Sequence, residues 1–425
     1  MKNKQTIILL FIANIISGFA QGITMLAIPW YFTKVFSMES FFALVYATTT
    51  FICIFWGLYA GVIVDKYSRK KVFLILNLIS GIIVTSIALI GYKNGNIPIP
   101  LIVAVFSMML LNFNVHYPNL YAFCQELTRK KDYKKITSYL EIVGQTTTVL
   151  SAAIAAILIE GTNNQSLYLL GIEFKLPFDI QAWTLKKIFL LDGITYFASL
   201  LVIFMIPYKA TFKKTNNETM LERMQQGISF LLNNKWIFVF GVFSYTLFAF
   251  LLAELFVVFP SYVNNYLKQG ADVMASSEVY YSLGALFSGF FIGSIFAKRN
   301  SVFSVITLIL IASGAFLMLF FIKKILLFFI ASFLIGFTNA GVRIFRTTYL
   351  FNRVPNNIIG RVNSVLGTIN TFIRVLLILV FSASFFSYGE NIKWAYLIGA
   401  IFLFGCVIPL ISNYKKLIRI KDIKE

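Results

Sequence analysis

Polar side chains recur at helical spacing within three stretches of this chain that are otherwise strongly apolar. In each stretch the polar residues lie three or four positions apart, so they share one face of a helix. Amide, hydroxyl, imidazole and guanidinium groups on such a face can bind a polar molecule or an ion in apolar surroundings. The three sets are Asn14, Ser17 and Gln21; Asn112, His116 and Asn119; and Asn339, Arg343 and Arg346.

Two ionisable side chains in apolar stretches could exchange protons. Glu254 has no evident partner, and a charge at the centre of a membrane costs about 2.5–3.5 kcal/mol, so Glu254 is a candidate for protonation. His116 is the only histidine, and imidazole changes charge near neutral pH. The alternatives are a water-exposed carboxylate at the outer rim and a packed, hydrogen-bonded imidazole. Arg374, in another apolar stretch, is a further candidate for the same cavity.

The elements that must position these residues are membrane helices. Of the 425 residues, 59% are hydrophobic and only 13% are charged, against about 25% in soluble domains. A span needs about 20 apolar residues, and helices satisfy their own backbone in lipid. We therefore predict an all-α polytopic membrane protein. About twelve spans are expected, near 7–33, 40–64, 72–92, 99–124, 137–159, 188–206, 236–260, 277–297, 302–322, 325–350, 362–387 and 392–413.

The net charge of +20 would suit a nucleic-acid-binding protein, but the distribution of the charge argues against that class. Most Lys and Arg lie near the chain ends and in the segments that follow even-numbered spans. Lys and Arg near the ends of spans stay in the cytoplasm, so both termini are expected in the cytoplasm, in a multi-pass protein of the cell (inner) membrane.

Cys53, Cys124 and Cys406 give neither a disulfide framework nor a metal-binding spacing, and no metal or cofactor is expected.

The spans divide into two sets of six. The expected parts are an N-terminal six-helix bundle at 1–207, a cytoplasmic linker with an amphipathic helix at 208–235, and a C-terminal six-helix bundle at 236–425. A shift of 227 residues pairs Asn112 with Asn339 and His116 with Arg343. Such pairing indicates a duplicated unit, which is typical of secondary transporters.

Two connecting segments have patterns of their own. The linker carries apolar residues on one helical face, which predicts a helix lying on the membrane surface. Residues 160–187 form a long outer loop with a brief alternation at 172–176, which predicts either a small hairpin or a segment on the outer leaflet.

A short basic loop separates the second and third spans. It runs from Gly61 to Lys71 as Gly-Val-Ile-Val-Asp-Lys-Tyr-Ser-Arg-Lys-Lys. These residues resemble the loop between helices two and three of the major facilitator superfamily. The resemblance covers nearly the whole chain and implies two six-helix pseudo-repeat bundles, with helices one, four, seven and ten lining a central cavity.

The resemblance also implies that Asp65 lies near the cytoplasmic start of helix eleven. A carboxylate at a helix N-terminus is stabilised by about 0.3–1 kcal/mol, so such a contact would act as a gate. The alternative is that the loop only sets the topology. The expected gate residues are Gly57, Gly61, Asp65, Arg69, Lys70, Gly360 and Arg361.

Three further motifs resemble the macrolide-efflux-type branch of the superfamily. They are Gly360-Arg361-Val362-Asn363-Ser364, Leu191-Asp192-Gly193-Ile194-Thr195-Tyr196-Phe197 and Gln226-Gly227-Ile228-Ser229-Phe230. Two departures are present. Residues 144–153 of the fifth span lack the proline common in antiporters, and the second half keeps Gly293, Lys298 and Arg299 of the basic loop but no Asp.

We therefore expect a secondary active transporter that works by alternating access and exports a hydrophobic or amphipathic, drug-like or macrolide-like molecule. Proton antiport through Glu254 or His116 is a hypothesis. An alternative is a facilitator or uptake carrier for an anionic metabolite, motivated by the three embedded Arg. A membrane enzyme or scaffold is the alternative from another class, and a single His with scattered acids argues against it. The expected partners are the substrate, the lipid bilayer and protons, with the chain acting as a monomer.

Overall fold

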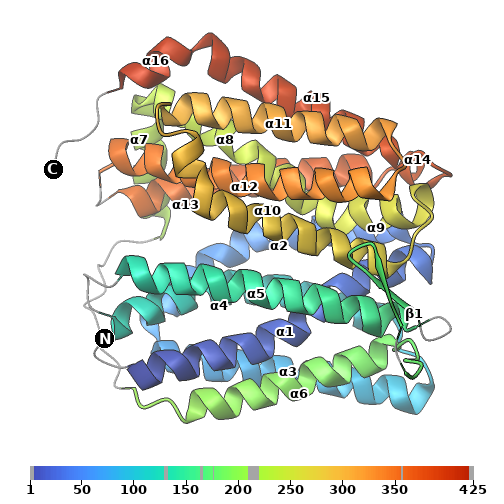
Figure 1. The fold of residues 1–425 in the computed structure, drawn as a ribbon. Helices are drawn as coiled ribbons and strands as arrows, with labels where there is room; N and C mark the ends of the chain where they lie inside the picture. Colours follow the sequence, from blue (N-terminus) through green and yellow to red (C-terminus); the bar gives the residue numbers. More distant parts are fainter. Residues whose placement is uncertain are drawn as a thin grey trace. The chain divides into compact units, whose positions relative to one another are not determined.

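The chain folds almost entirely into helices (Figure 1). The structure is a computed structural model that describes residues 4–128, 133–162, 166–175, 177–208, 220–355 and 358–420. Eleven helices in these ranges are long and apolar enough to cross a membrane. A twelfth long helix, α10 (Ala271–Ile295), has 25 residues and carries Asp272, Glu278 and five serines. The prediction of an all-α polytopic membrane protein with about twelve spans is confirmed.

The contacts divide the chain into two compact units. The first contains Met1–Ser37 and Thr48–Asn216, and the second contains Met38–Ala47 and Asn217–Glu425, so helix α2 contributes to both. Most of the first half of the predicted linker, residues 209–219, lies outside the described residues.

The helices of the first unit pack side by side around buried small and apolar residues. Small residues let helices approach closely where lipid offers no hydrophobic driving force between them. If Gly22 of α1 carried a Cβ atom, that atom would collide with Ser151 of α5, and a Cβ atom on Gly193 of α6 would collide with Thr85 of α3. The glycines therefore allow these helices to pack closely. The helices are α1 (Lys4–Lys34), α2 (Glu39–Lys66), α3 (Arg69–Asn94), α4 (Ile99–Leu127), α5 (Tyr133–Glu160) and α6 (Leu185–Phe204).

The start of α3 is fixed by a side-chain cap. Ser68 has extended backbone angles, and its Oγ accepts a hydrogen bond from the backbone N–H of Lys71 at 3.5 Å. Such a cap satisfies one of the unpaired N–H groups of the first turn. The turn between α2 and α3 is therefore tight, and it places Arg69 at the first position of α3.

The outer loop contains a two-stranded antiparallel hairpin. Strand β1 (Ser166–Leu169) pairs with β2 (Ile172–Lys175), with Ser166 opposite Lys175. Leu170 and Gly171 form the two-residue turn with φ of 58° and 78°, as right-handed strand twist favours. Of the two predictions for this loop, the hairpin is confirmed.

Besides the first part of α2, the second unit contains the amphipathic helix α7 and the spans that follow it. Its elements are α7 (Met220–Asn233), α8 (Lys235–Ala253), η2 (Glu254–Val258), α9 (Phe259–Ser261), η3 (Tyr262–Tyr266), α10, α11 (Ser301–Phe321), α12 (Ile325–Arg353), α13 (Ile359–Phe381), α14 (Ser384–Ser387), α15 (Lys393–Ser412) and α16 (Tyr414–Arg419). Leu231 of α7 is buried, and a Cβ on Gly227 would meet the backbone of Arg361. The helix therefore packs against α13 with one face.

The span that starts with α8 is not a regular α-helix over its whole length. It runs without a break to Tyr266, but 254–258 and 262–266 have π-helical hydrogen bonding. The N–H of Phe259 bonds to the carbonyl of Glu254, and that of Leu267 bonds to the carbonyl of Tyr262. Pro260 has no N–H, so the regular bond to the residue four positions earlier cannot form there. Wide turns of this kind are frequent at functional sites.

Candidate substrate and coupling site in the second unit

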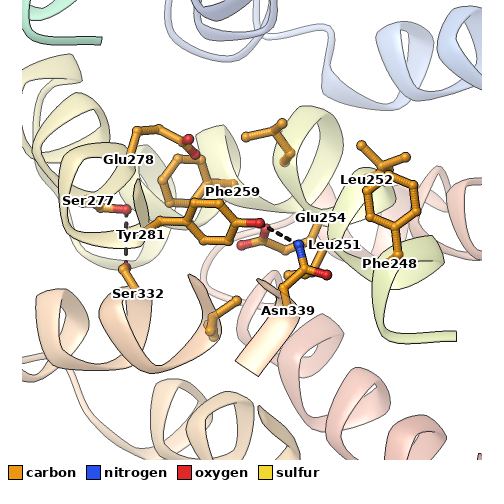
Figure 2. Close-up of a pocket in the computed structure, with 12 residues that line it drawn as sticks. Phe248, Leu251, Leu252, Glu254, Phe259, Ser277, Glu278, Tyr281, Ser332 and Asn339 are labelled. Carbon is orange, nitrogen blue, oxygen red and sulfur yellow. Dashed lines mark hydrogen bonds between the residues drawn. The ribbon is translucent and has the colours of Figure 1, made fainter. Parts of the chain in front are cut away.

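A cavity of about 90 Å³ lies inside the second unit (Figure 2). Its walls come from α8, η2, α9, α10 and α12. Six of the twelve lining residues are apolar, including Phe248 and Phe259, and the other six carry polar groups. Apolar and aromatic walls with placed polar groups are typical of sites for small molecules. The polar lining residues are Glu254, Ser277, Glu278, Tyr281, Ser332 and Asn339.

Glu254 occupies the junction between α8 and the first π-helical turn. Its Oε1 accepts a hydrogen bond of 2.6 Å from the hydroxyl of Tyr396 on α15. Tyr396 is itself fully buried, and its ring packs edge-on against that of Tyr262, with centroids 4.6 Å apart. The expectation that Glu254 lacks a partner is therefore wrong. Its partner lies 142 residues away in the sequence, where helical spacing cannot reveal it.

A second carboxyl group, that of Glu278 on α10, lines the same cavity. Within the described ranges no side chain donates a hydrogen bond to it. Tyr281, almost one helical turn later, lies within electrostatic reach of Glu254, Glu278 and Arg343. Its hydroxyl accepts a hydrogen bond of 2.6 Å from Nδ2 of Asn339 on α12, which Figure 2 shows as a dashed line. Hydrogen bonds between lining residues thus join α10 to α12, and Glu254 joins the α8 span to α15.

This arrangement can bind a proton or the cationic end of an amphipathic molecule. Two carboxyl groups that line one largely apolar cavity repel each other when both are ionised, so binding of a proton or a cation there is favoured. A cation can also interact with the faces of aromatic rings such as Phe248 and Phe259. A proton and a cationic molecule would therefore compete for the negative charge of the carboxyl groups of Glu254 and Glu278.

In the first unit, the predicted cavity residues bond mainly to one another and to their own bundle. His116 shares a hydrogen bond of 2.9 Å with Oδ1 of Asn14, and its ring packs against Phe73 and Tyr117. The structure thus has the packed, hydrogen-bonded imidazole that was the alternative to proton handling.

The other polar residues of the first unit are buried. The hydroxyl of Ser17 bonds back to the carbonyl of Ala13, and Gln21 lies beside it on the same face of α1. Asn112 donates to Ser80 at 2.9 Å, and Asn119 donates to the backbone carbonyl of Arg69 at 2.9 Å. These contacts tie α3 to α4.

The three embedded arginines lie in different surroundings. Arg346 is buried, with its guanidinium 3.5 Å from the centre of the Tyr245 ring and Nη1 3.4 Å from the carbonyl of Ser244. Arg343, one turn earlier on α12, is exposed and near Tyr281. Arg374 on α13 is partly buried, with an Nε that has no hydrogen-bond partner among the described residues. Of the three, Arg343 is the one placed beside the cavity.

Two of the predicted gate residues, Arg69 and Lys70, make polar contacts at the start of α3. Nε of Arg69 pairs with Oε1 of Glu126 at 3.0 Å, and the hydroxyl of Tyr208 donates to Oε2 of Glu126 at 2.5 Å. Burial raises the pKa of Tyr208 well above its ordinary value, and the bond to Glu126 adds to this rise. Lys70 donates to the carbonyls of Phe204 and Ile206, both at 2.8 Å.

The remaining gate residues are placed less fully. An added Cβ atom on Gly61 would have no neighbour within 4 Å, and one on Gly57 would make an ordinary contact with Asn114. The side chain of Asp65 lies outside the described part of the chain. In the second unit, Nη1 of Arg361 donates to Oε1 of Gln226 on α7, and Gly360 lies in the first turn of α13. The contact of Asp65 with helix eleven stays a prediction.

Sequence reasoning missed Glu278, Tyr281 and Tyr396. Glu278 was expected at the outer end of its span, which was predicted to begin near residue 277, whereas α10 begins at Ala271 and places Glu278 about two turns inside the helix. The signal that could have revealed it is the acidic residue followed by a long apolar run. Tyr281 and Tyr396 have no signal of their own, because buried tyrosines in apolar helices are common.

Residues 10–377 match the Major Facilitator Superfamily. The chain belongs to this superfamily. It is therefore a multi-pass membrane transporter for small molecules and not an enzyme, as the sequence predicted. The predicted resemblance to the superfamily is confirmed over most of the chain.

Individual relatives are distant. Macrolide efflux protein A of Streptococcus pyogenes is 21% identical over 364 residues, which cover 84% of each chain. Among solved structures, a bacterial homologue of the human lysosomal transporter Spinster superposes with a TM-score of 0.71 at 10% identity, covering 100% of this chain and 99% of the other. A D-xylose-proton symporter superposes with a TM-score of 0.70 at 12% identity, covering 96% and 97%. The solved structures establish the fold alone.

Proposed function

We propose that this protein is a secondary active transporter of the cell membrane, with both termini in the cytoplasm, that exports a hydrophobic or amphipathic small molecule in exchange for protons. Alternating access of the two bundles would carry the substrate, and the chain would act as a monomer. The observation that carries the proposal is the carboxyl group of Glu254, held by Tyr396 beside an aromatic-walled cavity.

The placement of Glu254 suits exchange of the substrate for protons better than passage of the substrate alone. In its ionised form the carboxylate attracts a cationic or partly cationic substrate, and in its protonated form it releases that substrate. Glu278 lines the same cavity and adds a second acid, which strengthens the competition between proton and substrate. His116, bonded to Asn14, is the weaker candidate for coupling.

The direction of transport is proposed from the relatives. Proteins named macrolide efflux protein A match most of this chain, although at only 21% identity. Uptake of an anionic metabolite has less support, because Arg346, one of the three arginines that motivated it, is used in packing against Tyr245.

The test is transport by the purified full chain in proteoliposomes with an imposed proton gradient, followed with a fluorescent lipophilic cation. Glu254→Gln keeps the shape and the Tyr396 contact but removes the titratable group. We expect it to abolish gradient-driven transport and, because the attracting charge is lost, to weaken binding of the lipophilic cation. Glu173→Gln, the same change in the exposed hairpin, is the control and should transport like the unchanged protein. Gradient-driven transport that survives in Glu254→Gln would refute the proposal.

We further propose that the loop after α2 gates the cytoplasmic side through Asp65 and the first turn of α13, including Gly360 and Arg361. Asp65→Asn should then lower the transport rate without lowering the melting temperature. An unchanged rate would leave the loop as a topology signal only.

A further inference from the structure

A fully buried acid in the first unit takes no part in the proposed function. Asp192 on α6 has no exposed surface. Its Oδ2 accepts a hydrogen bond of 3.1 Å from the hydroxyl of Thr24 on α1, while its Oδ1 is buried without a partner. A buried carboxylate oxygen of this kind needs an explanation, since nearly all buried polar atoms in proteins are paired.

Other oxygen atoms around Asp192 are unpaired in the same way. The hydroxyl of Tyr196, one turn later on α6, lies near Asp192, Asn112 and Ser80 but makes no well-formed hydrogen bond. Asn112 spends its amide N–H on Ser80 and leaves Oδ1 without a partner. Thr85 packs against Gly193, the neighbour of Asp192, and its hydroxyl is also buried and unpaired.

The cluster also lacks a positive charge. Across the described residues, no Lys, Arg or His pairs with Asp192, and its one hydrogen bond comes from a neutral hydroxyl. His116 of α4, the only histidine, is bonded to Asn14 instead. An ionised carboxylate buried in a membrane bundle is too costly without a counter-charge. The site therefore holds either a proton or another cation when the protein is folded.

We propose that Asp192 and the oxygens around it bind one sodium ion. Hard cations prefer oxygen ligands, and the cluster offers a carboxylate, an amide oxygen and hydroxyls from α1, α3, α4 and α6. One carboxylate balances one monovalent charge. The described residues contain no group of three His, Cys, Asp or Glu that would suit a divalent transition metal. A proton on Asp192 would satisfy only one of the four buried oxygens that lack a partner. The oxygens of Tyr196, Asn112 and Thr85 would remain without one.

The site is separate from the cavity of Glu254, because all of its residues belong to the first unit. Binding of the ion would tie four helices of that unit together. It can be measured without transport, so failure of the sodium site and failure of the proposed export function are distinguishable.

The test is the melting temperature of the purified full chain in detergent at constant ionic strength, with sodium chloride replacing choline chloride or potassium chloride. A ligand that binds the folded state raises stability with the logarithm of its concentration. We expect such a rise with sodium for the unchanged protein and for Glu254→Gln. Asp192→Asn, which keeps the Thr24 contact, should lose the sodium dependence, and Thr24→Val should need about tenfold more sodium.

Equilibrium binding of radioactive sodium to the same variants gives a second readout that does not depend on unfolding. No sodium-dependent rise in the unchanged protein, or an equal rise in Asp192→Asn, would overturn the proposal. A rise that follows acidification in sodium-free buffer and ignores sodium would also overturn it and would show that a proton occupies the site.

Discussion

The hydroxyl of Tyr396 donates a 2.6 Å hydrogen bond to Oε1 of Glu254 at the residue where α8 changes to π-helical turns. The bond joins α15 to the irregular part of the α8 span. Tyr396 is fully buried against Tyr262, so the donor has little freedom to move away. The carboxyl group is thus held in one orientation beside the cavity.

Removing this donor should impair proton-driven transport. In Tyr396→Phe the carboxyl of Glu254 loses a hydrogen bond worth about 1.5–3 kcal/mol when the acceptor is charged, which corresponds to about tenfold or more in rate. The measurement is initial efflux rate in proteoliposomes under a fixed proton gradient. Tyr388→Phe is the control, because Tyr388 is 80% exposed and should not change the rate. Equal rates in the two variants would show that the bond does not matter for transport.

Loss of the Glu126 carboxylate should destabilise the first unit. In Glu126→Gln the negative charge is lost, and the single amide oxygen replaces the two oxygens that accept separately from Arg69 and Tyr208. The side chains of Arg69 and Glu126 are only 14% and 17% exposed. We expect a cost of about 1–3 kcal/mol, seen as a lower melting temperature. Glu160→Gln breaks the more exposed pair with Lys34, at 26% and 42%, and should cost less than about 1 kcal/mol. The reverse order of the two melting temperatures would contradict this assignment.

The stabilising effect of the Tyr208 hydroxyl should persist into alkaline solution. Burial and the bond to Glu126 raise the pKa of Tyr208, so the neutral, donating form is favoured in the folded state. The contribution is therefore complete below the unfolded pKa of about 10 and is lost only as the pH rises through the higher folded value. The difference in melting temperature between the unchanged protein and Tyr208→Phe should stay constant from pH 7 to about 9.5. A difference that vanishes below pH 9 would refute the raised pKa.

The fold could be predicted because it depends on features that are local in sequence. The apolar spans, the charge distribution and the basic loop at Gly61–Lys71 each carry their own signal, and together they predicted the superfamily. Even the hairpin was visible as an alternation at 172–176. The apolar spans are visible in a single sequence because lipid requires them of every membrane-crossing helix.

The site was less predictable because its contacts are distant in sequence. Glu254 stood out as an acid in an apolar span, but Tyr396 lies on another helix and has no pattern of its own. Asn339 was predicted from helical spacing and does line the cavity, whereas Asn119, predicted in the same way, donates to the backbone of Arg69. A polar face shows that a helix has polar contacts and does not show which contacts these are.

Arg346 should prove important for stability rather than for substrate charge. In Arg346→Gln the contact with the Tyr245 ring and the bond to the Ser244 carbonyl are lost, at a cost of about 2 kcal/mol for a desolvated cation–π contact. The melting temperature should fall, and transport by the protein that remains folded should be kept. Lys298→Gln, at an exposed position, is the control. A variant that melts normally but no longer transports would instead place Arg346 in the substrate pathway.

The cavity should depend on the close packing of α10 on α12. A Cβ on Gly336 of α12 would overlap the backbone carbonyl of Tyr281 on α10, and backbone cannot move aside as a flexible side chain can. We expect Gly336→Ala to cost about 1–3 kcal/mol through overpacking and to disturb the bond between Asn339 and Tyr281. The control is Gly314→Ala on α11, where a Cβ would meet no atom; it should raise stability by about 0.5–1 kcal/mol. Melting temperatures and transport rates of both variants test this, and a stable, active Gly336→Ala would show that the two helices are not in close contact.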